Sequence, residues 1–273
     1  MKEEITLEEL KKIELNLLIE IDKICRENEF RYSLVGGTLL GAVRHQGFIP
    51  WDDDIDIAMP RPDYERFLAY CHNERPQFLT LCNKYEPNYG YLFAKICDAN
   101  TVMIEKNANK NNVKMGVYID VFPIDGFGET EKDSLKIFNK TAFQRELLVA
   151  SNWKRYFRSK THAWYYEPIR FGFFLMSRFV NFGKTIRSIE KKSIKSDFDK
   201  SKFCGVLCGS YRKKEIMPHE VYSEYVEIKF EGGNFLAIKE YDYYLSHIYG
   251  DYMKLPPEEK RVTHHTFSAY KTI

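Results

Sequence analysis

One segment limits the folds open to this chain more than any other. Residues 51–59, WDDDIDIAM, place four aspartates within five positions of an apolar, strand-like stretch. Carboxylates so close together repel one another, and removing them from water costs free energy. Because alternate residues of a strand share a face, the pattern predicts a buried strand on which Asp52, Asp54 and Asp56 point one way and Asp53 points away.

A cation is the partner that such a row of carboxylates needs. Mg²⁺ prefers oxygen ligands, and one or two carboxylates commonly hold it together with substrate phosphates. A bound cation would also relieve the repulsion between the aspartates. We therefore expect a Mg²⁺ or Mn²⁺ site in which Asp54 and Asp56 are the leading ligands and Asp52 assists.

A glycine turn precedes the aspartates. Gly36, Gly37 and Thr38 lie between a short predicted strand (30–37) and a short predicted helix (38–46). Glycines let the backbone approach a phosphate closely, and the start of a helix offers free N–H groups. Glycine turns and acidic clusters are each common, but the two in this order indicate a phosphate-binding and metal-binding site.

Composition excludes several classes of protein. The chain has 273 residues, 44% of them apolar, a net charge of +2 and a pI near 8.1, which indicates a globular protein and gives no general signal for nucleic acid. The first twelve residues are charged and do not resemble a signal peptide, and the six cysteines follow no paired framework. We expect a cytoplasmic protein with reduced thiols.

The remaining patterns alternate between helix and strand. Thr6 and Glu9 form a predicted capping box at the start of an amphipathic helix over 6–28. Further segments are expected as a helix at 63–73, strands at 91–105, 114–124 and 203–211, a hairpin around Gly232-Gly233 and a helix at 238–250. These elements predict an α/β fold with a mixed sheet and flanking helices.

The middle of the chain differs in texture. We expect a catalytic core at 1–128, a basic and aromatic helical insertion at 129–200, and a C-terminal part at 201–273 that completes the core. Within the insertion, 153–195 carries an apolar stripe with basic flanks, which suits an anionic membrane surface. A helical subdomain that packs this stripe on the core explains the pattern equally well.

The opening motifs resemble a known group of enzymes. A Gly-Gly-Ser/Thr turn followed by Asp-x-Asp is typical of the nucleotidyltransferase-fold superfamily. The longer string GTLLGAVRHQGFIPWDDDIDIAMPRPDYERF resembles the LicD family of bacterial phosphocholine transferases, to which fukutin and fukutin-related protein are distantly related. The resemblance extends to KICDANT (95–101), IDVFPIDG (119–126) and YGDYMKLPPEEKRVTHH (249–265). The spacing fits Asp52 as the first aspartate of the motif as well as Asp54.

The resemblance implies a third carboxylate and a reaction. Asp120 fits the third position, and Asp125, just before Gly126, fits a turn at the end of the strand instead. The implied reaction transfers phosphocholine, or a related phospho-alcohol, from CDP-choline or a similar donor to a sugar hydroxyl and releases CMP. The acceptor would be a cell-surface glycan or its lipid-linked precursor, which places the protein at the inner face of the cell membrane.

Several basic residues lie inside these family-like blocks. Residues expected to bind donor phosphates, beside the glycine turn, are Arg44, His45, Lys95 and Arg261. His264 and His265 suggest metal binding, but packing or surface roles are the simpler interpretation. Trp51 is a candidate for contact with a choline group and equally for core packing.

Two other functions fit the same residues. The protein could transfer a nucleotide from an NTP to a small molecule, because the aspartate site alone does not distinguish the two reactions. It could also be a non-catalytic, membrane-associated protein that kept the fold. The blocks beyond the aspartates favour phosphocholine transfer.

Overall fold

The computed structural model describes residues 3–105, 113–159, 163–194, 196–261 and 267–272. The helices in this part of the chain are α1 (Leu7–Glu27), α2 (Gly36–His45), α3 (Arg61–Glu74), α4 (Glu131–Ser151), α5 (Glu167–Ser177), α6 (Phe182–Ser193) and α7 (Tyr241–Tyr249). Five short 3-10 helices lie among the described residues, at Trp164–Tyr166, Phe198–Lys200, Arg212–Glu215, His219–Tyr222 and Glu258–Lys260.

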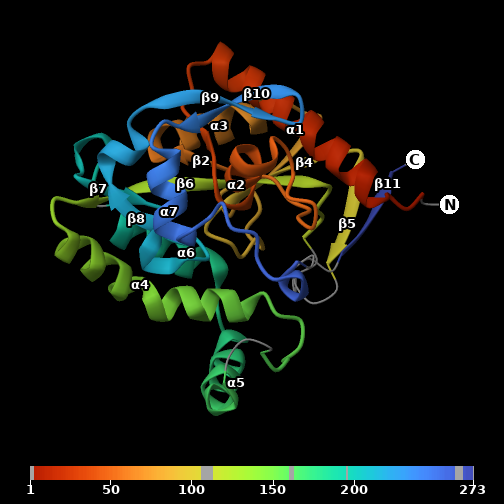
Figure 1. Ribbon diagram of the computed structural model, residues 1–273. Helices are drawn as coiled ribbons and strands as arrows, with labels where there is room; N and C mark the ends of the chain where they lie inside the picture. Colours follow the sequence, from red (N-terminus) through yellow and green to blue (C-terminus); the bar gives the residue numbers. More distant parts are fainter. Residues whose placement is uncertain (1–2, 106–112, 160–162, 195, 262–266, 273) are drawn as a thin grey trace.

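A mixed sheet forms the centre of the molecule (Figure 1). Its strands are β1 (Ser33–Leu34), β2 (Asp56–Pro60), β3 (Phe78–Leu81), β4 (Ala94–Asp98), β6 (Tyr118–Gly128), β7 (Phe203–Gly205), β8 (Ile216–Pro218), β9 (Tyr225–Phe230) and β10 (Gly233–Ile238). The order is β3-β4-β6-β2-β1-β10-β9. β7 pairs with the C-terminal end of β6 on one side and with β8 on the other. A separate pair is formed by β5 (Thr101–Glu105) and β11 (Phe267–Lys271). The predicted α/β class is confirmed.

The middle of the sheet brings distant parts of the chain into register. β2 and β6 are parallel, with Asp56 opposite Asp120, and β4 runs antiparallel to β6, with Lys95 opposite the same Asp120. The residues that alternate with these, including Ile57 and Val121, are fully buried in the main core with side chains of α1 and α3. One face of the central strands is therefore core, and the other carries the polar groups.

The helix and hairpin predictions are confirmed at both ends of the chain. Thr6 and Glu9 form the capping box of α1, with the Glu9 N–H donating to the Thr6 hydroxyl and the Thr6 N–H donating to the Glu9 carboxylate. β9 and β10 pair around the Gly232-Gly233 turn, with Phe230 opposite Gly233. Both features follow from local sequence alone.

The aspartate strand is shorter than predicted. β2 begins only at Asp56, so Asp52, Asp53 and Asp54 lie in the loop before it. The strand begins where β1 and β6 pair with it, and adjacent aspartates are poor strand formers. The expected alternation of Asp52, Asp54 and Asp56 along one strand face was therefore wrong.

Further strand predictions need correction. Of the expected strands 30–37 and 203–211, only β1 (Ser33–Leu34) and β7 (Phe203–Gly205) form. The expected strand 91–105 is two strands, β4 and β5, which belong to different sheets. The expected strand 114–124 is displaced to β6, which continues through Gly126 to Gly128 with a bulge against β7. Long-range pairing decides these boundaries.

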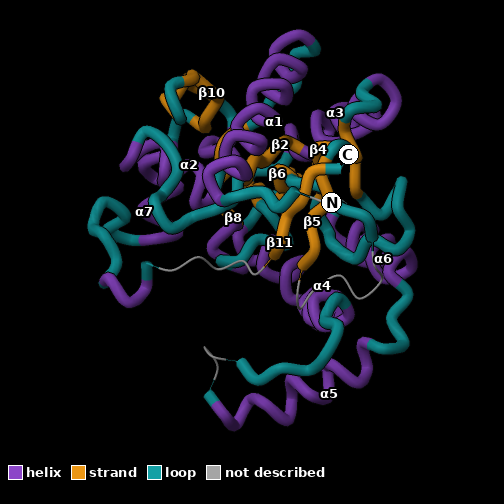
Figure 2. Tube along the Cα trace, turned by 90° about the vertical axis from the view of Figure 1, so that its right-hand side faces the viewer, coloured by secondary structure: helices purple, strands orange, loops and turns teal. Residues whose placement is uncertain are grey.

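The helices α4, α5 and α6 fall within 129–200, and α5 lies on the outer side of α4 at the edge of the molecule (Figures 1 and 2). The division into a core, an insertion and a C-terminal part stays a prediction. No helix among the described residues is long and apolar enough to cross a bilayer.

Candidate active site

Asp56 and Asp120 define the centre of the candidate site. They occupy facing positions on the parallel strands β2 and β6. The Asp56 N–H donates to the Thr38 hydroxyl at 2.8 Å, and the Val35 N–H donates to the Asp56 carbonyl at 3.1 Å. These two hydrogen bonds connect the backbone of Asp56, the first residue of β2, to the residues on either side of the two glycines.

The two glycines lie directly against two of the carboxylates. Gly36 has φ +57°, the left-handed conformation that glycine tolerates, and a Cβ there would lie 3.2 Å from Asp56 Oδ2. A Cβ on Gly37 would lie 2.5 Å from Asp52 Oδ2. Asp52 and Asp56 therefore lie at the N-terminus of α2, where the helix dipole favours negative charge.

The carboxylates interact strongly with one another. Burial raises the pKa of Asp56 well above its usual range, and the charges of Asp54, Asp120 and Asp52 raise it further, in that order. Lys95 opposes the shift. Asp53 is buried, with 5% of its surface exposed. The sequence therefore identified an acidic cluster correctly, although most of it precedes the strand.

Lys95 belongs to the centre of the site. Its ammonium lies 2.6 Å from Asp120 Oδ1 and 3.4 Å from the centre of the Tyr118 ring. The residue is 3% exposed. A buried lysine in this position contributes positive charge beside the aspartates at a fixed place, which suits an anionic ligand such as a phosphate.

The other basic residues predicted to bind phosphate lie together on another side of the acidic cluster. The Arg44 Nε lies 2.9 Å from His45 Nε2, and the His45 and Trp51 rings are 6.4 Å apart. The Arg261 guanidinium lies 5.6 Å from the Trp51 ring, and burial, together with the Arg261 charge, lowers the pKa of Arg44. These residues meet beside Trp51, which directly precedes Asp52. His264 and His265 lie outside the described residues.

Asp125 has a role that the sequence did not indicate. The expectation that it forms a turn at the strand end was wrong, because it lies within β6, opposite Gly205. Its carboxylate accepts two hydrogen bonds from Arg61, at 2.6 and 2.9 Å, and both side chains are largely buried. Asp125 is thus a structural ion-pair partner away from the acidic cluster.

Glu14 was missed by the sequence analysis. It lies on the buried face of α1, is 2% exposed, and its Oε2 has no hydrogen-bond partner among the described residues. Burial raises the pKa of Glu14, and the charges of Asp54, Asp53 and Asp120 add to the shift. The signal was present, since Glu14 interrupts an apolar helical stripe between Leu10 and Leu17.

Tyrosines form a further wall of the site, and of these only Tyr249 lies in a family-like block. The Tyr211 and Tyr249 rings are 5.0 Å apart, and burial raises the pKa of both phenols, with Asp56 adding to each shift. The Gly36 N–H donates to the Tyr244 hydroxyl at 3.4 Å. These aromatic side chains come from the C-terminal third, and only the folded chain brings them to the glycine turn.

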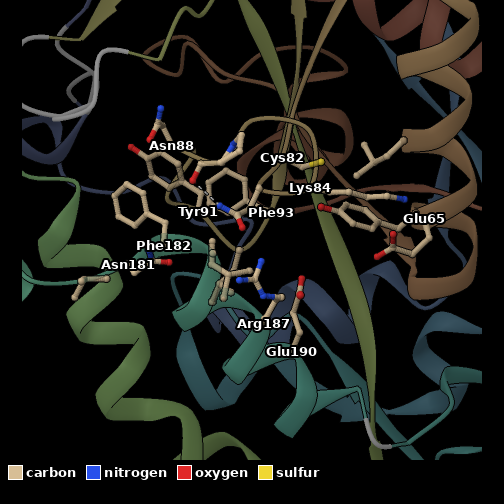
Figure 3. A pocket seen from close by; sticks show the side chains of 18 residues that line it. Glu65, Cys82, Lys84, Asn88, Tyr91, Phe93, Asn181, Phe182, Arg187 and Glu190 are labelled. Atoms are coloured by element: carbon tan, nitrogen blue, oxygen red, sulfur yellow. Dashed lines mark hydrogen bonds between the residues drawn. The ribbon is translucent and has the colours of Figure 1, made fainter.

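A polar cleft of about 820 Å³ opens beside the site (Figure 3). Its labelled side chains come from three segments: Glu65 of α3; Lys84, Asn88, Tyr91 and Phe93 before β4; and Arg187 and Glu190 of α6. The Phe93 ring lies 5.3 Å from Lys95 Nζ and 4.6 Å from the Phe122 ring, so one wall of the cleft reaches the Lys95–Asp120 pair.

The carboxylates fit a cation that is shared with a ligand. In the parts of the chain that the structure describes, no three His, Cys, Asp or Glu side chains are grouped as a metal site. Mg²⁺ needs only one or two carboxylates when substrate phosphates complete its ligands. The mutual repulsion at Asp56 is what a divalent cation would relieve, so Asp56 and Asp120, in facing positions on β2 and β6, are a suitable pair of donors.

Comparison with known proteins identifies the family. The sequence profile described as LicD/FKTN/FKRP, nucleotidyltransferase domain, matches residues 29–167. The chain is also 32% identical over 270 residues to the lipopolysaccharide cholinephosphotransferase LicD of Haemophilus influenzae, a match that covers 97% of this chain and 98% of that protein. The chain belongs to the LicD family.

Other known proteins match shorter parts of the chain. An uncharacterized protein of Rickettsia typhi is 33% identical over 120 residues, or 44% of this chain and 37% of that protein. Mannosyltransferase regulator 4 of Saccharomyces cerevisiae is 28% identical over 145 residues, or 50% of this chain and 12% of the yeast protein. The LicD-family profile spans the glycine turn, the aspartates, Lys95 and Asp120, whereas Arg261 lies outside it.

Proposed function

We propose that this protein transfers phosphocholine from CDP-choline to a sugar hydroxyl of a lipopolysaccharide or related cell-surface glycan and releases CMP. The observation that carries the proposal is the register of Asp56 with Asp120, beside Lys95 and the Gly36-Gly37 turn, in a chain related over its whole length to a lipopolysaccharide cholinephosphotransferase. The site offers positioning and charge compensation, which are the main requirements of phosphoryl-type transfer.

Each group has a place in the reaction. Asp54, Asp56 and Asp120, assisted by Asp52, would hold Mg²⁺ or Mn²⁺, which supplies charge neutralisation at the phosphates when bound. The backbone N–H groups at the start of α2, with Arg44, His45 and Arg261, bind and orient the diphosphate. Trp51, Tyr211 and Tyr249 offer aromatic faces to the trimethylammonium group of choline.

The transfer step needs one proton acceptor. The acceptor hydroxyl oxygen forms a bond to the phosphorus that carries choline, and the bond from that phosphorus to the oxygen of the departing CMP breaks. Asp120, positioned by Lys95, takes the proton from the hydroxyl. Lys95 also places a positive charge beside the negative charge that develops on the transferred group.

The polar cleft is the proposed place of the acceptor sugar. Its mixture of amides, charged groups and aromatic faces suits a glycan (Figure 3). Its Phe93 wall adjoins the Lys95–Asp120 pair. A cytoplasmic location at the inner face of the cell membrane, where a lipid-linked precursor is accessible, fits this function.

Isothermal titration with CDP-choline, with and without Mg²⁺, tests the donor assignment. We expect Mg²⁺-dependent binding to the native protein and none to Asp54→Ala. Binding of CTP or ATP in place of CDP-choline would favour nucleotide transfer. If native and variant proteins both fold normally and bind neither the cation nor any of these donors, the non-catalytic alternative holds.

A further inference from the structure

The helix α5 exposes its apolar face to solvent. Ile169, Leu175 and Met176 are 59%, 50% and 45% exposed, and Phe179, just beyond the helix, is 91% exposed. These positions follow the helical period and share one side of the helix. Trp164 and Tyr165, just before α5, are 78% and 59% exposed.

Arg170 of α5 and Arg178, which directly follows the helix, face α4 and the segment after it. Arg178 donates hydrogen bonds to the carbonyls of Trp153 and Ala150, each at 2.9 Å, and its guanidinium lies 4.4 Å from the Phe174 ring. Arg170 lies 4.9 Å from the Trp153 ring. Both arginines are therefore held against the protein, beside aromatic side chains such as Phe174, while a set of apolar side chains stays exposed.

The alternative in which the stripe packs on the core does not account for this face. Phe173 contacts α4, with its ring centre 5.4 Å from that of Phe143, and this contact anchors the helix. The helix itself lies at the edge of the molecule, below α4 in Figure 1 and again in Figure 2. A contiguous apolar surface of this kind marks an interaction site.

Charge indicates what covers the face. Residues 153–195 contain eleven Lys and Arg against two Glu, although the whole chain has a net charge of only +2. Basic residues that flank the helix in the sequence are exposed: Lys154, Arg155 and Arg158 before it, and Lys184 and Lys191 after it. Apolar and aromatic side chains framed by basic residues are typical of helices that lie on anionic lipid.

We propose that α5 and the preceding aromatic turn, residues Trp164 to Phe179, insert their apolar face into the interfacial region of an anionic phospholipid membrane. Phe179, Leu175 and Ile169 enter the apolar layer, Trp164 and Tyr165 lie at the headgroup level, and the flanking lysines and arginines contact lipid phosphates. The inference builds on the proposed membrane location. It needs neither donor nor metal, so its failure would leave the transfer proposal intact.

Co-sedimentation with vesicles tests the inference. We expect the full chain to bind vesicles of equal parts phosphatidylcholine and phosphatidylglycerol, to bind pure phosphatidylcholine much more weakly, and to dissociate as salt rises. The double variant Leu175→Glu/Phe179→Glu should lower the bound fraction on the order of tenfold or more. The matched control is Ile19→Glu on α1, which is 47% exposed in the native protein and should leave binding unchanged.

Tryptophan fluorescence gives a second readout. Anionic vesicles should shift the emission of the native protein to shorter wavelength, and Trp164→Phe, which leaves Trp51 and Trp153, should remove most of the shift. Thermal melting of the variants checks that they fold. The inference is overturned if vesicle binding survives in the folded double variant or is equally strong on neutral lipid. It is also overturned if the native chain ignores vesicles and forms a dimer that the double variant abolishes.

Discussion

The Lys95 ammonium and the Asp120 carboxylate form a 2.6 Å ion pair across the neighbouring strands β4 and β6. Both side chains are largely buried, at 4% and 14% exposure. Removing one partner of a buried pair leaves a charge without its counterpart, and Lys95→Met should therefore lower the free energy of unfolding by about 3–5 kcal/mol. Urea denaturation without divalent cation measures this loss.

The double variant Lys95→Met/Asp120→Asn provides the control. Because both charges are then absent, it should be more stable than Lys95→Met alone. Purely additive losses in the double-mutant cycle would show that the two groups are not coupled.

The two carboxylates of β6 should respond differently to the same substitution. Asp125→Asn weakens the buried pair with Arg61 and should reduce stability by about 3–5 kcal/mol while retaining Mg²⁺-dependent donor binding. Asp120→Asn should abolish transfer, because it removes a metal ligand and the proton acceptor. Thermal melting and CDP-choline turnover, measured on both variants, compare the two. The assignment of Asp120 fails if Asp125→Asn loses turnover while still folded and Asp120→Asn keeps it.

A substitution in the glycine turn tests whether donor binding depends on the position of the Asp52 carboxylate. A methyl group at Gly37 would lie 2.5 Å from Asp52 Oδ2, so Gly37→Ala must displace that carboxylate. We expect donor affinity in the presence of Mg²⁺ to fall on the order of tenfold to a hundredfold, because small displacements in such sites are costly. Titration calorimetry measures the affinity.

A variant at a second glycine, Gly232, is the control that separates a clash in the site from backbone strain. Gly232 has φ +80°, and a methyl group added there would meet nothing within 4 Å, so Gly232→Ala introduces strain of roughly 1–2 kcal/mol without touching the site. It should lower stability and leave donor affinity at the native value. Equal affinity losses in Gly37→Ala and Gly232→Ala would refute the role given to Asp52.

The raised pKa of Glu215 should make the stability of the protein depend on pH. Burial raises the pKa of Glu215 from 4.5 to about 7, and the carboxylate accepts a hydrogen bond from the Tyr211 N–H at 3.2 Å. Between these pH values the unfolded chain has lost the proton and the folded chain keeps it, so stability falls as pH rises. The native protein should lose about 2–3 kcal/mol relative to Glu215→Gln between pH 4.5 and 7.

The matched measurement is the unfolding free energy of both proteins at several pH values across that window. The difference should level off above pH 7, where both states of the native protein are ionised. A constant difference over the whole range would contradict the raised pKa.

Local chemistry explains which parts of the fold the sequence predicted. The capping box of α1 and the hairpin at Gly232-Gly233 depend on neighbouring residues, so their positions were accessible without a structure. The β2 boundary depends on pairing with β1 and β6, which no local pattern contains. Asp52 to Asp54 were accordingly placed on a strand that begins only at Asp56.

The same difference between local sequence and long-range packing applies to the candidate site. The motifs named the glycine turn, the aspartates and Lys95, and the fold brings all of these together. Tyr211 and most of the lining of the polar cleft lie outside the motifs, because their positions follow from the packing of segments far apart in the chain. Sequence patterns also did not reveal that α5 directs its arginines inward, since a helical stripe does not specify which side faces the protein.

The register between Asp56 and Asp120 has a consequence for how this family can diversify. Both residues are fixed by the β2–β6 ladder, and the helices α4 to α6 follow β6 in the chain. Changes in the length or surface of 129–200 therefore leave the spacing between the two carboxylates untouched. A new acceptor or a new docking surface can be acquired by exchanging that segment, while the reacting groups are inherited unchanged.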